Sequence, residues 1–351
     1  MGLRRSLLKA SISALSVLLA LVFGAFIILI VGKSPFVAYG YLFKGAFGSA
    51  HSIGETLVKA TPLLFTGLAA VFSYQCGMFN LGGEGQFIMG AIAANWFSTR
   101  FSAIEGVPNI LISLLLGIVA GGLWGAIPGI LKSWRNLNEM IISILLNYIA
   151  TFFMAYLYSG PLMEANIPQT AAIAQANRLT RFMPPTRVHT GLFIAVGLTL
   201  LIYYFLYSTA KGYEMRAVGF NPIAARVNGL PVKRLMVMSF IISGAIAGLG
   251  GAVEVLGVSY RLMAGFAAGF GFDGVAIALI GQLNPIGTAF IAYLFAVLRV
   301  GANTMQVGAK IPTAIVDIIQ AVIIIFAIAA TAYVQLPSFQ KVMAKIEKRE
   351  R

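Results

Sequence analysis

Long apolar runs separated by short polar stretches recur along the whole chain. A membrane-spanning helix needs about 20 predominantly apolar residues. By this measure we predict ten spans, near residues 12–31, 56–75, 82–98, 109–131, 139–159, 190–208, 235–256, 272–283, 285–303 and 312–333. The eighth is too short for a straight crossing and the third begins in a glycine-rich stretch, so we expect both to be discontinuous helices. The pattern indicates an all-α polytopic membrane protein.

Composition supports this fold class. Of the 351 residues, 59% are hydrophobic and only 10% are charged, whereas soluble domains average about 25% charged residues. The longest polar stretches, 160–189 and 209–234, are too short to bury a core of their own. A single cysteine, Cys76, excludes a disulfide scaffold. We therefore expect residues 1–351 to form one transmembrane domain.

The positive charge follows the spans. The net charge is +14, but the basic residues lie beside apolar spans instead of alternating with exposed aromatic residues, so a nucleic-acid groove is not indicated. More than half of the 25 Lys and Arg residues fall in the segments that are inside if the N-terminus is inside. The positive-inside rule then predicts that both termini are cytoplasmic, together with the 209–234 loop and a basic tail at 334–351.

Enzymatic chemistry is not indicated. The two histidines, His51 and His189, have no Cys or carboxylate partners at metal-ligand spacing. Gly32-Lys33-Ser34 resembles the end of a phosphate-binding loop, but the required first glycine would fall at Ile27. We expect no metal, no cofactor and no ATP hydrolysis in this chain.

Small residues are spaced for helix packing on two spans. Glycine recurs at every fourth position of the fourth span, and the seventh span repeats this spacing. Such stripes let helix backbones approach closely in a membrane. We expect packing within the chain, with a subunit contact as the alternative, for Gly117, Gly121, Gly125, Gly129, Gly244 and Gly248.

The stretch FNLGGEGQ at 79–86 places polar groups among glycines directly before an apolar span. A carboxylate within a membrane is costly unless it faces a cavity or a partner, and glycines permit a helix break. Phe79, Asn80, Glu84 and Gln86 are therefore candidates for the lining of a translocation path. The alternative is that Glu84 caps its own helix at an aqueous surface.

A second stretch has a similar construction. Phe272-Asp273-Gly274 opens the eighth span as Glu84-Gly85 opens the third. The predicted topology gives these two spans opposite directions, so they are candidates for equivalent broken helices of an inverted repeat that meet near the midplane. Asn147, on the otherwise apolar fifth span, is a further candidate for the path or for an interhelical hydrogen bond.

The 209–234 loop carries the signals of a short, closed helix. Asn221 can cap it, Pro222 suits the first helical position, and Gly229 suits the stop. This helix is either a surface connector or a docking element that presents Ala224, Ala225 and Arg226 to a partner.

These motifs together resemble a known family. FNLGGEGQ, NEMIISILLNYIA at 138–150, the GFNPIAARVNGL loop and ALIGQLNPIG at 278–287 are similar to integral membrane permease subunits of ABC importers. The similarity is to the nucleoside and simple-sugar branch, which is related to the ribose and branched-chain amino acid permeases. It covers about residues 34 to 333, with Leu81 and Gly83 where Ile and Ala are frequent.

The resemblance implies a function and partners. The chain would be the permease subunit of an ATP-driven importer in the bacterial plasma membrane, and it would pass nucleosides to the cytoplasm. ATP would be bound by separate ATPase subunits, two copies or one fused tandem, which would dock on the coupling helix at Asn221–Gly229. A second permease, related but different, and an extracytoplasmic binding protein or lipoprotein would complete the assembly. The alternatives are a ribose- or galactose-type sugar permease and a gradient-driven secondary transporter.

Overall fold

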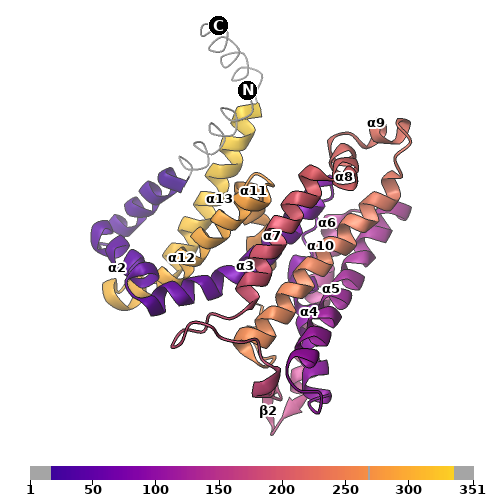
Figure 1. Ribbon diagram of the computed structural model, residues 1–351. Helices are drawn as coiled ribbons and strands as arrows, with labels where there is room; N and C mark the ends of the chain where they lie inside the picture. The colour runs from indigo at the N-terminus through magenta and orange to yellow at the C-terminus, as the bar shows by residue number, and fades with distance from the viewer. Residues whose placement is uncertain (1–16, 268, 336–351) are drawn as a thin grey trace, which may run out of the picture. The chain divides into compact units, whose positions relative to one another are not determined.

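A computed structural model describes residues 17–267 and 269–335 (Figure 1). Contacts between residues divide the chain into two compact units. The first unit combines the described residues before Ile53 with those from Val297 onward, and the second comprises Ile53–Ala296.

Helices account for most of the described chain. Their bounds are Val17–Ile30, α2 Pro35–Phe47, α3 Ala50–Gln75, α4 Gly83–Arg100, α5 Val107–Arg135, α6 Glu139–Ser159, α7 Gly191–Ser208, α8 Ala210–Phe220, α9 Pro222–Val227, α10 Val232–Glu254, α11 Phe270–Ile280, α12 Pro285–Ala309 and α13 Ala314–Gln335. A 3₁₀ turn, Gln175–Asn177, and a π-helical turn, Val255–Ser259, complete the helical elements.

A helix lies in each of the ten ranges predicted from hydropathy. Six of the described helices, α3, α5, α6, α7, α10 and α12, are long and apolar enough to span a membrane. The eighth predicted span corresponds to α11, which has only 11 residues. The number of crossings and the side of the termini stay predictions. Residues 12–16 of the first range, the basic residues Arg4, Arg5 and Lys9, and residues 336–351 of the basic tail lie outside the described residues.

Two helices were not predicted. The helix α2 begins at Pro35 directly after Ser34 and has 13 residues, which is shorter than a membrane span. The helix α8, Ala210–Phe220, carries three charged residues among its eleven and lies within the 209–234 loop, for which only the short helix at 221–229 was predicted. Apolar length located the spans, so α2, which is too short, and α8, which is polar, were missed although Pro35 and the capping residue Thr209 mark their starts.

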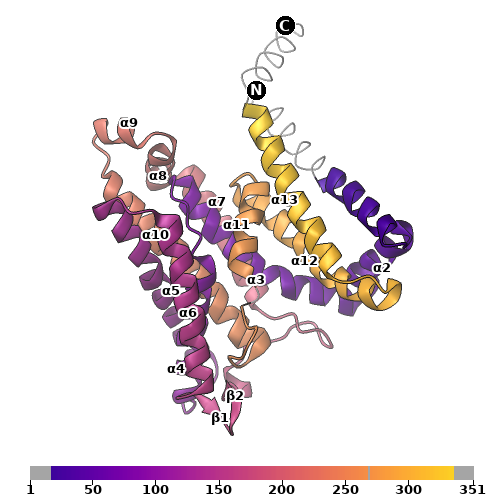
Figure 2. The ribbon, with the colours of Figure 1, turned by 180° about the vertical axis from the view of Figure 1, so that it is seen from behind.

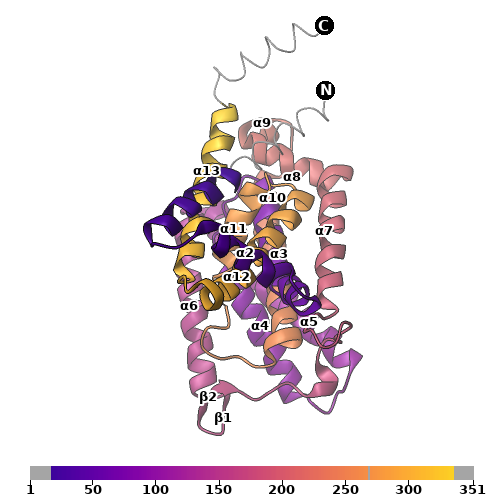
Figure 3. The same cartoon turned by 90° about the vertical axis from the view of Figure 1, so that its left-hand side faces the viewer.

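The second unit is organised around α10. This helix packs along α5 and α4, and α6 lies next to α4 (Figures 1 and 2). The short helices α8 and α9 lie at one end of this bundle (Figure 3). At the opposite end the strands β1, Met163–Glu164, and β2, Ile167–Thr170, form an antiparallel hairpin.

The glycine stripes lie at the contact between α5 and α10. A Cβ atom added to Gly121 would overlap the Gly244 carbonyl and the Gly248 backbone, and one added to Gly244 would overlap Gly121. Gly117, Gly125 and Gly129 also face α10. The stripes therefore bring two helix backbones into direct contact within one chain, as small residues do in membranes.

Glycines also allow close helix packing in the first unit. Gly45 on α2 faces Thr304 and Gly301 on α12, and Gly308 faces Tyr41. On the helix Val17–Ile30, Gly24 lies against Ile319 of α13. At each contact a glycine stands where a larger side chain would hold the helices apart, so the helices of this unit also pack at close range.

We predict that Gly121→Ala destabilises the protein while Gly197→Ala does not. A methyl group at position 121 meets backbone atoms that cannot move away, and overpacking of this kind costs about 1–3 kcal/mol. Gly197 lies within α7, and no atom beyond its own stretch of helix lies within 4 Å of the place that an added methyl group would take, which makes it a matched control. Heat-induced loss of the monodisperse peak of the detergent-solubilised variants measures the difference. Equal loss from both variants would contradict the packing role of Gly121.

Candidate functional site

The starts of the two broken helices α4 and α11 meet. Glu84, in the first turn of α4, accepts hydrogen bonds from the backbone N–H of Gly269 at 2.9 Å and of Gly271 at 2.5 Å. Its side chain thus satisfies N–H groups at the start of α11, which have no partner within their own helix. A Cβ atom at Gly271 would overlap the backbone of Glu84. Glu84 caps a helix, as one alternative had it, but the helix is α11 and not α4.

Asp273 lies in the first turn of α11 and is half-buried. Its backbone N–H donates to the carbonyl of Gly269, so the residue closes the first turn after the glycine-rich segment. A carboxylate at this position interacts favourably with the N-terminal end of the helix dipole. The two helix starts that the sequence analysis paired therefore each carry an acidic residue in their first turn.

The two amides of the FNLGGEGQ motif bind one another. Asn80 Nδ2 donates to Gln86 Oε1 and to Ser243 Oγ, both at 2.9 Å, and Gln86 Nε2 donates back to Asn80 Oδ1 at 3.2 Å. Asn80 Oδ1 also accepts from the Gly82 N–H, and Ser243 Oγ donates to the carbonyl of Ala69. This network joins α3, the linker after it, α4 and α10.

Asn147 reaches the same linker from α6. Its Nδ2 donates to the carbonyl of Leu81 and its Oδ1 accepts from the Gly85 N–H, both at 2.8 Å. A Cβ atom at Gly85 would overlap Asn147, so this bond needs glycine at position 85. The Asn147 amide thus makes interhelical hydrogen bonds that satisfy one carbonyl and one N–H group of the helix break.

Burial separates the motif into two parts. Asn80, Glu84, Gln86 and Asn147 are at most 6% exposed, and the contacts above engage their polar atoms. Phe79 is 44% exposed and makes an edge-to-face contact with Tyr74. In this conformation the polar residues fix the position of two broken helices, and Phe79 is the side chain of the motif that faces outward.

The predicted short helix is present as α9. Asn221 Oδ1 accepts from the N–H groups of Ile223 and Ala224, both at 3.0 Å, and Gly229 has a φ of 79°. Ala225 is only 5% exposed. The expectation that Ala225 faces a partner is therefore corrected: it packs under the helix, whereas Ala224 and Arg226 are exposed.

Apolar side chains that the sequence analysis did not single out dominate the surface of this end. Phe220, Ile223 and Val227 are 86%, 76% and 83% exposed. Ile223 and Val227 are four residues apart on α9 and therefore lie on one side of it, a signal that is readable in the sequence; Phe220 ends α8, before the extended Asn221. Exposed apolar groups of this size are typical of a protein interface.

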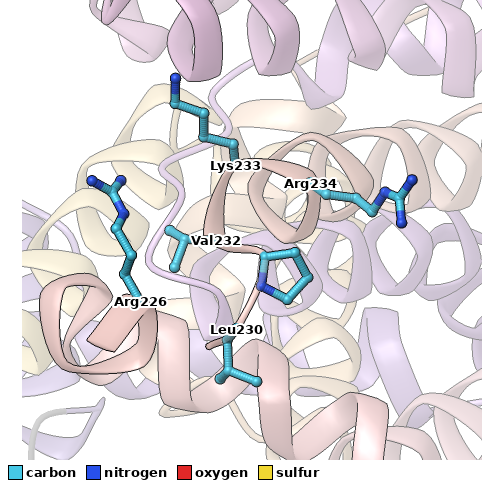
Figure 4. A pocket seen from close by; sticks show the side chains of 6 residues that line it. Arg226, Leu230, Val232, Lys233 and Arg234 are labelled. Carbon is cyan, nitrogen blue, oxygen red and sulfur yellow. The ribbon is translucent and has the colours of Figure 1, made fainter. Parts of the chain in front are cut away.

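A shallow basic groove of about 350 Å³ lies beside α9 (Figure 4). Arg226, Lys233 and Arg234 line it together with Leu230, Pro231 and Val232. The three charged side chains point in different directions, so the groove presents a spread of positive charge instead of a single anion site (Figure 4).

The opposite end of the second unit carries an ordered loop, residues 160–190. Tyr260, at the end of the π-helical turn, is contacted by Arg178 over its ring at 4.2 Å, and its hydroxyl accepts from Arg181 at 2.8 Å. Arg187 pairs with Glu55 of α3 through two hydrogen bonds. These pairs were missed because residues from distant segments form them.

His189 belongs to the same loop and is 1% exposed. Burial, together with the nearby charge of Arg181, lowers the pKa of His189 to about 4, so its imidazole is neutral near pH 7. The Gly191 N–H donates to its Nδ1. Within residues 17–267 and 269–335 no group of three potential ligand residues could hold a metal ion.

Comparison with known proteins identifies the family. Residues 52–328 match the family described as branched-chain amino acid transport system / permease component. The guanosine ABC transporter permease protein NupP of Bacillus subtilis is 36% identical over 341 residues, which cover 95% of this chain and 96% of NupP.

Two further relatives match over similar lengths. The glucose ABC transporter permease protein TsgB13 of Haloferax volcanii is 35% identical over 332 residues, 90% of this chain and 86% of that protein. The nucleoside ABC transporter permease protein NupB of Lactococcus lactis is 34% identical over 348 residues, 96% and 95% of the two chains. With these matches over nearly its whole length, the chain belongs to the branched-chain amino acid transport system permease family, and it is a multi-pass membrane subunit of a transport system and not an enzyme.

Proposed function

We propose that this chain is the permease subunit of an ATP-driven importer that passes nucleosides across the bacterial plasma membrane. The observation that carries the proposal is the 36% identity with a guanosine permease over 95% of the chain. The nucleoside permease NupB supports it over the same length. The chain would form half of the path as a single transmembrane domain with ten spans and both termini in the cytoplasm.

The exposed apolar side chains on α8 and α9 support docking of a separate ATPase subunit at this end. Ile223 and Val227 would insert into a groove of the ATPase, and Arg226 with the basic groove beside it would meet acidic side chains. Asn221 and Gly229 would define the ends of this coupling helix. ATP would then be bound by two ATPase copies or one fused tandem, and this chain would hold no cofactor or metal of its own.

The connectivity of α9 suggests how ATP hydrolysis would reach the helix break. The helix α10 begins at Val232, five residues after α9 ends at Val227. Close packing on α5 makes α10 move as one body with its neighbours, and Ser243 on α10 binds Asn80 in the linker. A displacement of α9 would thus pass along α10 to the linker and to the contact between Glu84 and α11.

The other partners follow from the architecture of an importer. A second, related permease would supply the other half of the path, and an extracytoplasmic binding protein or lipoprotein would deliver the substrate. The candidate path residues are Phe79, Asn80, Glu84, Gln86, Asn147 and Asp273; the polar ones would act by fixing two broken helices of an inverted repeat, and Phe79 would face the path.

A simple-sugar permease is the second candidate, because the glucose permease TsgB13 is 35% identical over 90% of the chain. Nucleosides and sugars share a polyhydroxylated ring, so the same path could pass either. A gradient-driven transporter is a weaker alternative, since it has no use for an exposed, capped α9.

Uptake of labelled guanosine by cells with and without this chain tests the substrate. We expect uptake that requires the chain and that excess nucleoside abolishes, while ribose, galactose and free bases leave it unchanged. If sugars compete and nucleosides do not, the substrate is a sugar and not a nucleoside. If deletion of this chain leaves the uptake of nucleosides and of sugars unchanged, the proposed function is contradicted.

We predict that Glu84→Gln lowers uptake per transporter at least about tenfold, because it weakens charge-assisted hydrogen bonds worth roughly 1.5–3 kcal/mol each. Glu105→Gln is the matched control, since Glu105 lies exposed in the loop between α4 and α5. Uptake is divided by the amount of protein in the membrane. If Glu84→Gln reduces uptake only in proportion to expression, Glu84 has a folding role alone.

We predict that Ile223→Glu and Arg226→Glu abolish the stimulation of ATP hydrolysis by the permease without changing membrane insertion. Each places a negative charge on the exposed side of α9 where the ATPase would dock. Arg135→Glu reverses an exposed charge at the end of α5 and controls for charge reversal as such. ATPase activity of the purified complex and co-purification of the ATPase subunit are the measurements. If both variants show wild-type ATPase activity and co-purification, α9 is not part of the docking surface.

A further inference from the structure

The helix α12 carries a row of polar side chains along a membrane span. Arg299, Asn303 and Gln306 follow one another at spacings of four and three residues. At about 100° per residue these three positions lie within about 60° of one another on the helix surface. They form one polar face, to which Lys310 is added just past the end of the helix.

The opposite face of α12 is the one that packs within the first unit. Gly301, Thr304 and Gly308 contact α2, and they also fall within about 60° of one another on the helix surface. The two groups lie on opposite sides of the helix. The polar face is therefore directed away from α2, and both Asn303 and Gln306 are exposed in the isolated chain.

Depth in the membrane makes this exposure informative. Asn303 is six residues from Ala309, so at 1.5 Å per residue it lies about 9 Å inside the nearer end of this candidate span. Polar and charged groups at such depth do not face lipid; they face protein or a water-filled cavity.

We propose that the polar face of α12, formed by Arg299, Asn303 and Gln306, lines the water-filled part of the substrate path. The proposal rests on the proposed function. The amides of Asn303 and Gln306 each donate and accept hydrogen bonds. This set suits a neutral solute rich in hydroxyl and carbonyl groups, and the sugar ring and base of a nucleoside carry both.

The residues of this face differ from those of the FNLGGEGQ motif in one respect that matters for contact with substrate. The polar atoms of Asn80, Gln86 and Asn147 bind other parts of the protein, whereas the side chains of Asn303 and Gln306 are open on the surface of the chain. The motif positions helices, and the α12 face supplies groups that a passing solute can reach.

Cysteine accessibility tests the proposal in the assembled transporter. Asn303→Cys places a thiol on the polar face of α12, and Phe290→Cys places one about 140° away on the same helix, where the native side chain is apolar and 73% exposed. The native Cys76 is fully buried, so it contributes little background. The probe is a membrane-impermeant, positively charged methanethiosulfonate reagent, applied to inside-out and right-side-out vesicles.

We expect the Asn303→Cys variant to react at least about tenfold faster than Phe290→Cys from one side of the membrane, because only water carries the reagent to that depth. Excess guanosine should slow the reaction. Equal rates in the two variants, or an Asn303→Cys thiol that resists the reagent but cross-links to a second subunit, would overturn the proposal. The outcome is independent of the uptake test, since the reagent reports water at position 303 whichever solute is carried.

A functional variant pair completes the test. Asn303→Leu and Gln306→Leu remove the hydrogen-bonding groups and keep the helix, so we expect uptake per transporter to fall while ATPase stimulation by the permease is retained. Val300→Leu serves as the control on the same helix. Unchanged uptake in both polar-face variants would show that this face is not part of the path.

Discussion

A break in a membrane helix leaves backbone N–H and C=O groups without partners, and lipid offers none. Each unsatisfied group costs several kcal/mol, so a broken helix persists only where the protein itself supplies the missing hydrogen bonds. In this chain the carboxylate of Glu84 supplies acceptors to the start of α11, and Asn147 serves the linker before α4. These few bonds hold α4, α6 and α11 together at the break.

Close glycine packing is the second condition for this arrangement. Gly121, Gly244 and Gly248 bring α5 and α10 together until backbone meets backbone, and Gly271 brings α11 onto the start of α4. A side chain at any of these positions would hold the helices too far apart for short hydrogen bonds across the break. The close glycine packing and the hydrogen bonds across the break therefore depend on each other.

Local sequence was sufficient to predict where the apolar helices lie, but not which of their faces are buried. Hydropathy located the spans because apolar length is a local property, and it missed α2, whose 13 residues are too few for a span. The capped α9 was predicted from Asn221, Pro222 and Gly229, since capping is also local. Ala225 lies underneath α9 because burial depends on the neighbouring segment. The polar residues of FNLGGEGQ were singled out in the same local way, but Glu84 binds a segment 185 residues away in the chain. Long-range pairing of this kind carries no local signal.

Burial then separates two roles that look alike in the sequence. A polar side chain deep in the membrane is either fully engaged with other parts of the protein, or it is open and must be covered by water or by a partner in the assembly. Asn80, Gln86 and Asn147 belong to the first class, and Asn303 to the second. The first class can transmit a movement, because it couples backbone segments rigidly. Only the second class can contact a solute without first breaking hydrogen bonds that hold the fold, and this difference favours α12 over the helix break as the surface that the substrate meets.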